Sequence, residues 1–98
     1  MDKEQHAINI GKALIMDTVR NANSGHTGGP LSSIDFAYVL FKDFLKFDPD
    51  NPNWFDRDRF VLSIGHESAL LYTILTFMGW LEVEDLKNFR QLHSKTPG

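Results

Sequence analysis

Two histidines in glycine-containing segments are the residues whose type and position could carry chemistry. His66 follows Ile64 and Gly65, where a short apolar run gives way to a helical pattern. Ligands of open parallel sheets bind beyond the carboxyl ends of the strands, and the amides of a helix N-terminus attract phosphate. His66 could therefore donate a hydrogen bond to a phosphate oxygen. The alternative is a structural histidine whose ring bonds a backbone carbonyl in a strand-to-helix turn.

His26 lies in the second such segment, residues 25–30, which read Gly-His-Thr-Gly-Gly-Pro. Glycines at this density allow a backbone to approach a ligand closely, or simply make a tight connection between two helices. A histidine in a ligand-binding loop can act as an acid, a base or a hydroxyl-binding group. The segment matches neither a Walker loop nor the glycine pattern of a dinucleotide fold. Both interpretations, binding loop and structural connection, stay open at this level.

Helical spacing of apolar residues accounts for most of the chain. Asp2 is a candidate N-cap for the first helix, with Gln5 as its capping-box partner. Residues 25–33 are expected to form a loop that ends at a capping serine. The predicted helices cover about residues 3–21, from a cap at Ser32 or Ser33 to just before Phe47, residues 67–78 and residues 83–89.

Residues 60–64, Phe-Val-Leu-Ser-Ile, form an apolar run typical of a strand that is buried on both faces. Such a strand needs neighbours to satisfy its backbone. The chain offers only a weak second candidate, around Leu81 and Val83. We therefore expect the neighbouring strands in sequence outside these 98 residues, which makes the chain a fragment of a larger domain.

The composition narrows the possible partners and the compartment. Hydrophobic residues make up 42% and charged residues 23%, which is ordinary for a globular protein. A net charge of -3 with scattered basic residues argues against nucleic acid and against acidic membrane surfaces. The absence of cysteine excludes disulfides and thiolate metal sites. With a polar start unlike a signal peptide, the chain is expected to be soluble and cytoplasmic.

Three segments in register resemble the signatures of transketolases. Residues 24–32 resemble the family's Gly-His-x-Gly-x-Pro-Leu motif, which is followed by Gly or Ser. Residues 58–66 resemble a second signature, and residues 85–98 match a third block. The similarity covers nearly the whole chain. It identifies residues 1–98 as an incomplete, N-terminal part of a thiamine-diphosphate-binding domain of the α/β class, here mostly helical with one short strand.

The resemblance implies a chemistry and a role for four residues. Transketolases move a two-carbon ketol unit from a ketose phosphate to an aldose phosphate, with thiamine diphosphate as the electron sink. By motif match, His26 contacts the donor hydroxyl and assists proton transfer, and His66 lies against the cofactor diphosphate. Gly29 sits close to the thiazolium ring, and Gly65 gives the turn that presents His66.

The resemblance also shows what this chain lacks or changes. Ile64 stands where the family usually has Asn, and Glu67 where a small residue is common. A carboxylate close to a diphosphate repels it unless it is turned away. The ligands of the Mg²⁺ or Ca²⁺ ion lie outside this chain, so no metal ligand is assigned within it. The glutamate that activates the cofactor is also missing. In the family it comes from the partner subunit, because the active sites lie across a homodimer interface.

Two alternatives differ from this interpretation. One is a related enzyme, such as dihydroxyacetone synthase or 1-deoxyxylulose-5-phosphate synthase; the block at residues 85–98 favours transketolase over the latter. The other is a non-catalytic fragment that serves as an interaction or assembly module. In either case the isolated 98 residues are expected to be inactive.

Overall fold

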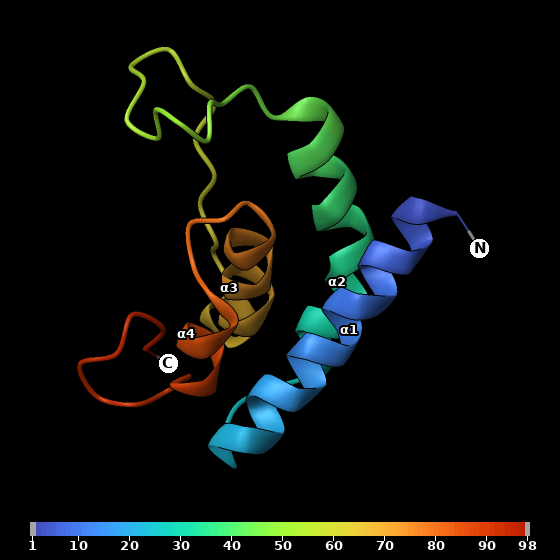
Figure 1. The fold of residues 1–98 in the computed structure, drawn as a ribbon, viewed down its shortest axis with the longest axis vertical. Coiled ribbons are helices and arrows are strands. Elements are labelled where there is room, and N and C mark those ends of the chain that lie inside the picture. The colour runs from blue at the N-terminus through green and yellow to red at the C-terminus, as the bar shows by residue number, and fades with distance from the viewer. Residues whose placement is uncertain (1, 98) are drawn as a thin grey trace.

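The computed structural model describes residues 2–97 and begins with a long helix, α1 (Lys3–Ala22) (Figure 1). Its start is where the sequence predicts: the Asp2 carboxylate accepts a hydrogen bond from the Gln5 amide at 2.7 Å. The helix ends at Asn23, whose left-handed backbone (φ 51°) returns its N–H to the last carbonyls of α1. Both ends are therefore set by local capping.

Helix α2 (Gly28–Val39) begins earlier than predicted. The expected caps, Ser32 and Ser33, lie inside the helix, and residues 28–33 are helical rather than part of a loop. Pro30 explains the difference, because proline is tolerated in the first helical turn, where its missing N–H would have no helical partner. A π-helical turn, η1 (Leu40–Phe44), extends the element.

The second half of the chain holds shorter elements. A 3₁₀ turn, η2 (Gly65–Glu67), leads into α3 (Ser68–Phe77), and α4 (Val83–Lys87) follows. A capping box between Glu82 and Asp85 starts α4. The Thr96 hydroxyl donates to the Asp85 carbonyl at 2.7 Å, so the C-terminal turns fold back onto α4. The predicted third and fourth helices are confirmed, with slightly different ends.

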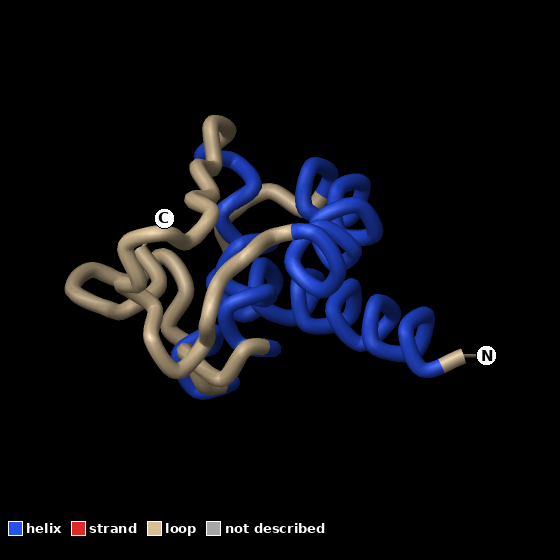
Figure 2. Tube along the Cα trace, turned by 90° about the horizontal axis from the view of Figure 1, so that it is seen from above, coloured by secondary structure: helices blue, strands red, loops and turns tan. Residues whose placement is uncertain are grey.

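The predicted strand at residues 60–64 is not formed. This segment is a loop without β-pairing, and the described residues contain no strand (Figure 2). Val61 is 82% exposed and Ile64 is 52% exposed, so the segment is not buried on both faces either. The physical reason is that a strand is defined by its ladder, and no described residue supplies a neighbouring strand.

Three helices enclose the core. α1 and α2 lie side by side, and α3 packs against both of them (Figure 1). Gly11 permits this approach: a Cβ at this position would lie 2.5 Å from Ile34 Cδ1 and 3.3 Å from the Phe77 ring. None of the described helices combines the length and apolar character needed to cross a membrane. The buried apolar residues are Ile8, Ile15, Ile34, Ala37, Ala69, Leu70, Ile74, Leu86 and Phe89.

Gly11→Ala should destabilise the protein although alanine is the better helix former. Helix propensity favours alanine by about 1 kcal/mol, whereas overpacking a core costs about 1–3 kcal/mol. We expect a net loss of roughly 1 kcal/mol in the free energy of unfolding by urea titration, from the difference between these terms. Ile34→Val removes the clashing Cδ1 and costs about 0.5–1.5 kcal/mol alone. The double variant should lose less than the sum of the singles; strict additivity would contradict the contact.

Candidate functional site

The two histidines singled out in the sequence meet in the structure. The ring centroids of His26 and His66 are 4.4 Å apart, and the rings are perpendicular. Both side chains are exposed, so the pair faces outward from the core. Two glycine-containing segments that are distant in sequence therefore present their imidazoles at one place on the surface.

Helix packing brings the two histidines together. His26 lies just before the N-terminus of α2, and His66 lies in η2, just before α3. α2 packs against both α3 and η2, with Ile34 and Ile74 in the shared core. The N-terminal ends of α2 and α3 are therefore held next to each other, and the histidines are carried at those ends.

Gly25 shapes the backbone immediately before His26. Its φ of 124° lies in the region that favours glycine, and a Cβ there would be 3.0 Å from the Phe89 ring. The turn between α1 and α2 thus lies against the buried Phe89. This contact fixes the position of the backbone at His26.

The helix ends beside the histidines lack side-chain caps. Among the described elements, α1 is capped by Asp2 and α4 by a capping box, whereas α2, η2 and α3 have no side-chain cap hydrogen bond. The first amides of a helix have no partner within the helix and carry partial positive charge. Exposed imidazoles beside such amides form a suitable set of donors for the oxygens of a diphosphate.

Glu67 is turned toward α2. Its carboxylate accepts a hydrogen bond from the Ser33 hydroxyl at 2.8 Å. In the part of the chain that the structure describes, no ion pair joins Glu67 to His26 or His66. Ser33 is not predicted from the sequence as a partner of Glu67, because its position there suggests a helix cap.

The two glycines assigned to the site differ in their surroundings. A Cβ at Gly29 would lie 2.8 Å from Glu67 Cγ and 2.9 Å from its Oε1, so the crowding at this position comes from Glu67. A Cβ at Gly65 would meet no described atom within 4 Å. Their assignments to the thiazolium ring and to the turn at His66 stay predictions.

Other candidate positions lie apart from the histidine pair. Among residues 2–97, no group of three or more His, Asp or Glu side chains is placed to bind a metal ion. His6 in α1 and His93 near the C-terminus are exposed.

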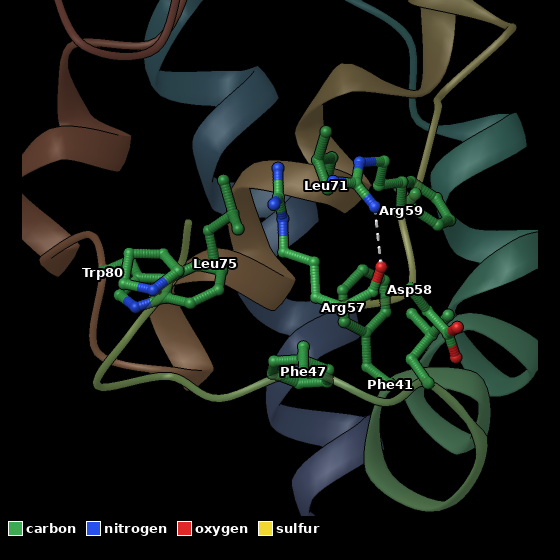
Figure 3. A pocket seen from close by; sticks show the side chains of 11 residues that line it. Phe41, Phe47, Arg57, Asp58, Arg59, Leu71, Leu75 and Trp80 are labelled. Atoms are coloured by element: carbon green, nitrogen blue, oxygen red, sulfur yellow. Dashed lines mark hydrogen bonds between the residues drawn. The ribbon is translucent and has the colours of Figure 1, made fainter. Parts of the chain in front are cut away.

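A pocket near the middle of the chain is also separate (Figure 3). Phe41, Phe47 and Trp80 line it together with Arg57 and Arg59, but neither His26 nor His66 does. The pocket therefore lies where the loop at residues 45–60 meets η1, α3 and Trp80, and it is not part of the candidate site.

Comparison with known proteins identifies the family of this chain. Residues 3–98 match the family described as "Transketolase, thiamine diphosphate binding domain". The chain is 56% identical over 99 residues to Transketolase 1 and 59% identical over 91 residues to Transketolase 2 of Escherichia coli (strain K12). A Pichia stipitis transketolase variant in complex with fructose-6-phosphate superposes with a TM-score of 0.94, at 50% identity and over 99% of this chain.

The helical fold and the matched signatures define a thiamine-diphosphate-binding domain. The chain belongs to the transketolase family. The alignment with Transketolase 1 covers 100% of this chain but only 15% of that protein. The alignment with Transketolase 2 covers 92% of this chain and 14% of that protein. The Pichia stipitis protein is covered over 14% of its length.

The histidine contact predicts a specific nuclear magnetic resonance signature. With ring centroids 4.4 Å apart, ring protons of His26 and His66 should show direct cross-relaxation in a nuclear Overhauser spectrum. The chain has four histidines, and His6 and His93 serve as internal controls. Among the histidine rings, cross-peaks should link only His26 and His66. Resolved signals without a cross-peak between His26 and His66 would mean that the two segments do not meet in solution.

Proposed function

We propose that this chain supplies His26 and His66 to the active centre of a transketolase, which transfers a two-carbon ketol unit from a ketose phosphate to an aldose phosphate. The observation that carries this proposal is the contact of the two imidazoles beside uncapped helix ends. Membership of the transketolase family gives the reaction class. The fructose-6-phosphate bound by the Pichia stipitis protein supports a sugar phosphate as substrate.

The residues of this chain bind and move protons in that proposal. His66 and the first amides of η2 donate hydrogen bonds to the diphosphate of the cofactor. His26 contacts the donor hydroxyl and exchanges its proton as the carbon–carbon bond breaks. Gly29 lies close to the thiazolium ring, and Gly65 gives the turn that presents His66. Thiamine diphosphate, when bound, supplies the electron sink for bond cleavage.

Other parts of the active centre are proposed to come from outside these residues. The chain spans about 15% of the curated relatives that it matches, and the described residues offer no metal-binding cluster. We place the ligands of Mg²⁺ or Ca²⁺, and the glutamate that activates the cofactor, beyond the matched segment. The working enzyme would then be a cytoplasmic homodimer in which each centre draws on both subunits.

A non-catalytic assembly module is the second candidate, and exposed apolar side chains favour it. Phe36 is 69% exposed, Phe44 is 70% exposed and Val61 is 82% exposed, which suits a chain that packs against other protein. Calorimetric titration of the isolated 98 residues with thiamine diphosphate and Mg²⁺ tests whether they bind the cofactor without the rest of the protein. We expect neither binding heat nor turnover. Micromolar binding would show that these residues are not functionally inert.

His26→Ala and His66→Ala should affect different steps in the intact protein. Without His26 we expect kcat/KM for transfer from xylulose 5-phosphate to ribose 5-phosphate to fall by about 10²–10⁴, the usual contribution of a positioned acid or base. Without His66 we expect the Kd of thiamine diphosphate to rise roughly tenfold, with kcat partly recovered at saturating cofactor. A coupled spectrophotometric assay and calorimetry separate the two effects.

His6→Ala is the matched control, because His6 is an exposed histidine on α1 away from the pair. Its kinetic constants should stay at wild-type values. If His26→Ala behaved like His6→Ala, the proposed role of His26 would be wrong. If the intact protein failed to transfer two carbons between these sugars, a related thiamine-diphosphate enzyme would be favoured.

A further inference from the structure

We propose that Glu67 is a positioning residue: Ser33 holds its carboxylate over Gly29, which ties the His66 turn to α2 and keeps the negative charge away from the histidine pair. The link between the two elements depends only on contacts within this chain. Its effect on cofactor binding rests on the proposed function.

The hydrogen bond joins the two elements that carry the site. Glu67 is the residue after His66 in η2, and Ser33 lies in the second turn of α2, which His26 precedes. The donor–acceptor distance of 2.8 Å is that of a good hydrogen bond, and both side chains are half-buried. A hydrogen bond from a hydroxyl to a carboxylate is stronger than one between two neutral groups, particularly away from water. The bond therefore fixes the turn that presents His66.

Gly29 provides the space for this arrangement. A Cβ at position 29 would come within 2.8 Å of Glu67 Cγ, 2.9 Å of Oε1 and 3.2 Å of Cδ. All three contacts are with the Glu67 side chain, so position 29 has no room for a methyl group while Glu67 keeps its bond to Ser33. The glycine at 29 and the long side chain at 67 are thus complementary in size.

The position of the carboxylate matters because of its charge. Unit charges a few ångströms apart interact by several kcal/mol when water is partly excluded. A Glu67 carboxylate without the Ser33 bond could approach a diphosphate bound at His66 and repel it. Bonded to Ser33, it forms no ion pair with either imidazole within the described residues. The two rings then stay available to phosphate oxygens.

Thermal unfolding of the intact protein without cofactor tests the size complementarity. Gly29→Ala and Glu67→Ala should each lower Tm, the first by crowding and the second by loss of the bond to Ser33. In the double variant the three atoms nearest to a Cβ at position 29 are gone. We expect it to be more stable than Gly29→Ala alone, with a departure from additivity of roughly 3 °C or more. Additive Tm shifts would overturn the pairing.

Calorimetry with thiamine diphosphate and Mg²⁺ tests the placement of the charge. Ser33→Ala releases the carboxylate and should weaken cofactor binding roughly tenfold. Ser32→Ala is the matched control, because the Ser32 hydroxyl bonds the Gly29 carbonyl and not Glu67. Glu67→Gln keeps the acceptor without the charge and should bind at least as tightly as wild type. The double variant Ser33→Ala/Glu67→Ala should recover most of the cofactor affinity that Ser33→Ala loses.

The dependence of cofactor affinity on ionic strength distinguishes an electrostatic effect of Glu67 from a loosened turn at His66. Because salt screens exposed charges, the deficit of Ser33→Ala should shrink as ionic strength rises from about 0.05 to 0.5 M. Equal affinities of Ser33→Ala and Ser32→Ala would overturn the role in charge placement. So would a Ser33→Ala deficit that Glu67→Ala does not relieve. If wild type bound no thiamine diphosphate, the proposed function would fail, and the thermal series would still decide whether Gly29 and Glu67 are coupled.

Discussion

The contact between α2 and α3 is the constraint on which the rest of the site depends. Ile34 from α2 and Ile74 from α3 are buried in one cluster with Ile15 of α1, and this cluster fixes how the helices cross. Because His26 and His66 are carried at the N-terminal ends of α2 and α3, the same packing sets the distance between their rings. The catalytic proposal therefore rests on an apolar core, and the Ser33–Glu67 bond adds a polar tie near the surface.

Features controlled by neighbouring residues could be predicted from the sequence. The Asp2 cap and the apolar spacing along α1 depend only on residues within a few positions, and both are confirmed. The two histidines could also be singled out, since glycines and turn residues mark their segments. Their contact could not be derived from local pattern, because it depends on how α2 and α3 pack. Only the resemblance to transketolases pointed to a shared site.

The errors have physical causes outside the local pattern. Ser32 and Ser33 predict too late a start for α2 because both look like caps, whereas Pro30 is already in the first turn. The strand at residues 60–64 was predicted from composition, but a strand also requires a partner, and residues 2–97 provide none. The role of Ser33 could not be foreseen, since its acceptor Glu67 is brought near only by the tertiary fold.

A crystal structure of the intact protein grown with thiamine diphosphate and Mg²⁺ would test the central claim most directly. The account predicts diphosphate oxygens within hydrogen-bond distance of the His66 imidazole, with the His26 ring facing the same cavity. It also predicts that Glu67 still bonds Ser33 and does not contact the diphosphate. A cofactor bound away from both histidines, or imidazoles of His26 and His66 separated by the fold of the complete protein, would contradict it.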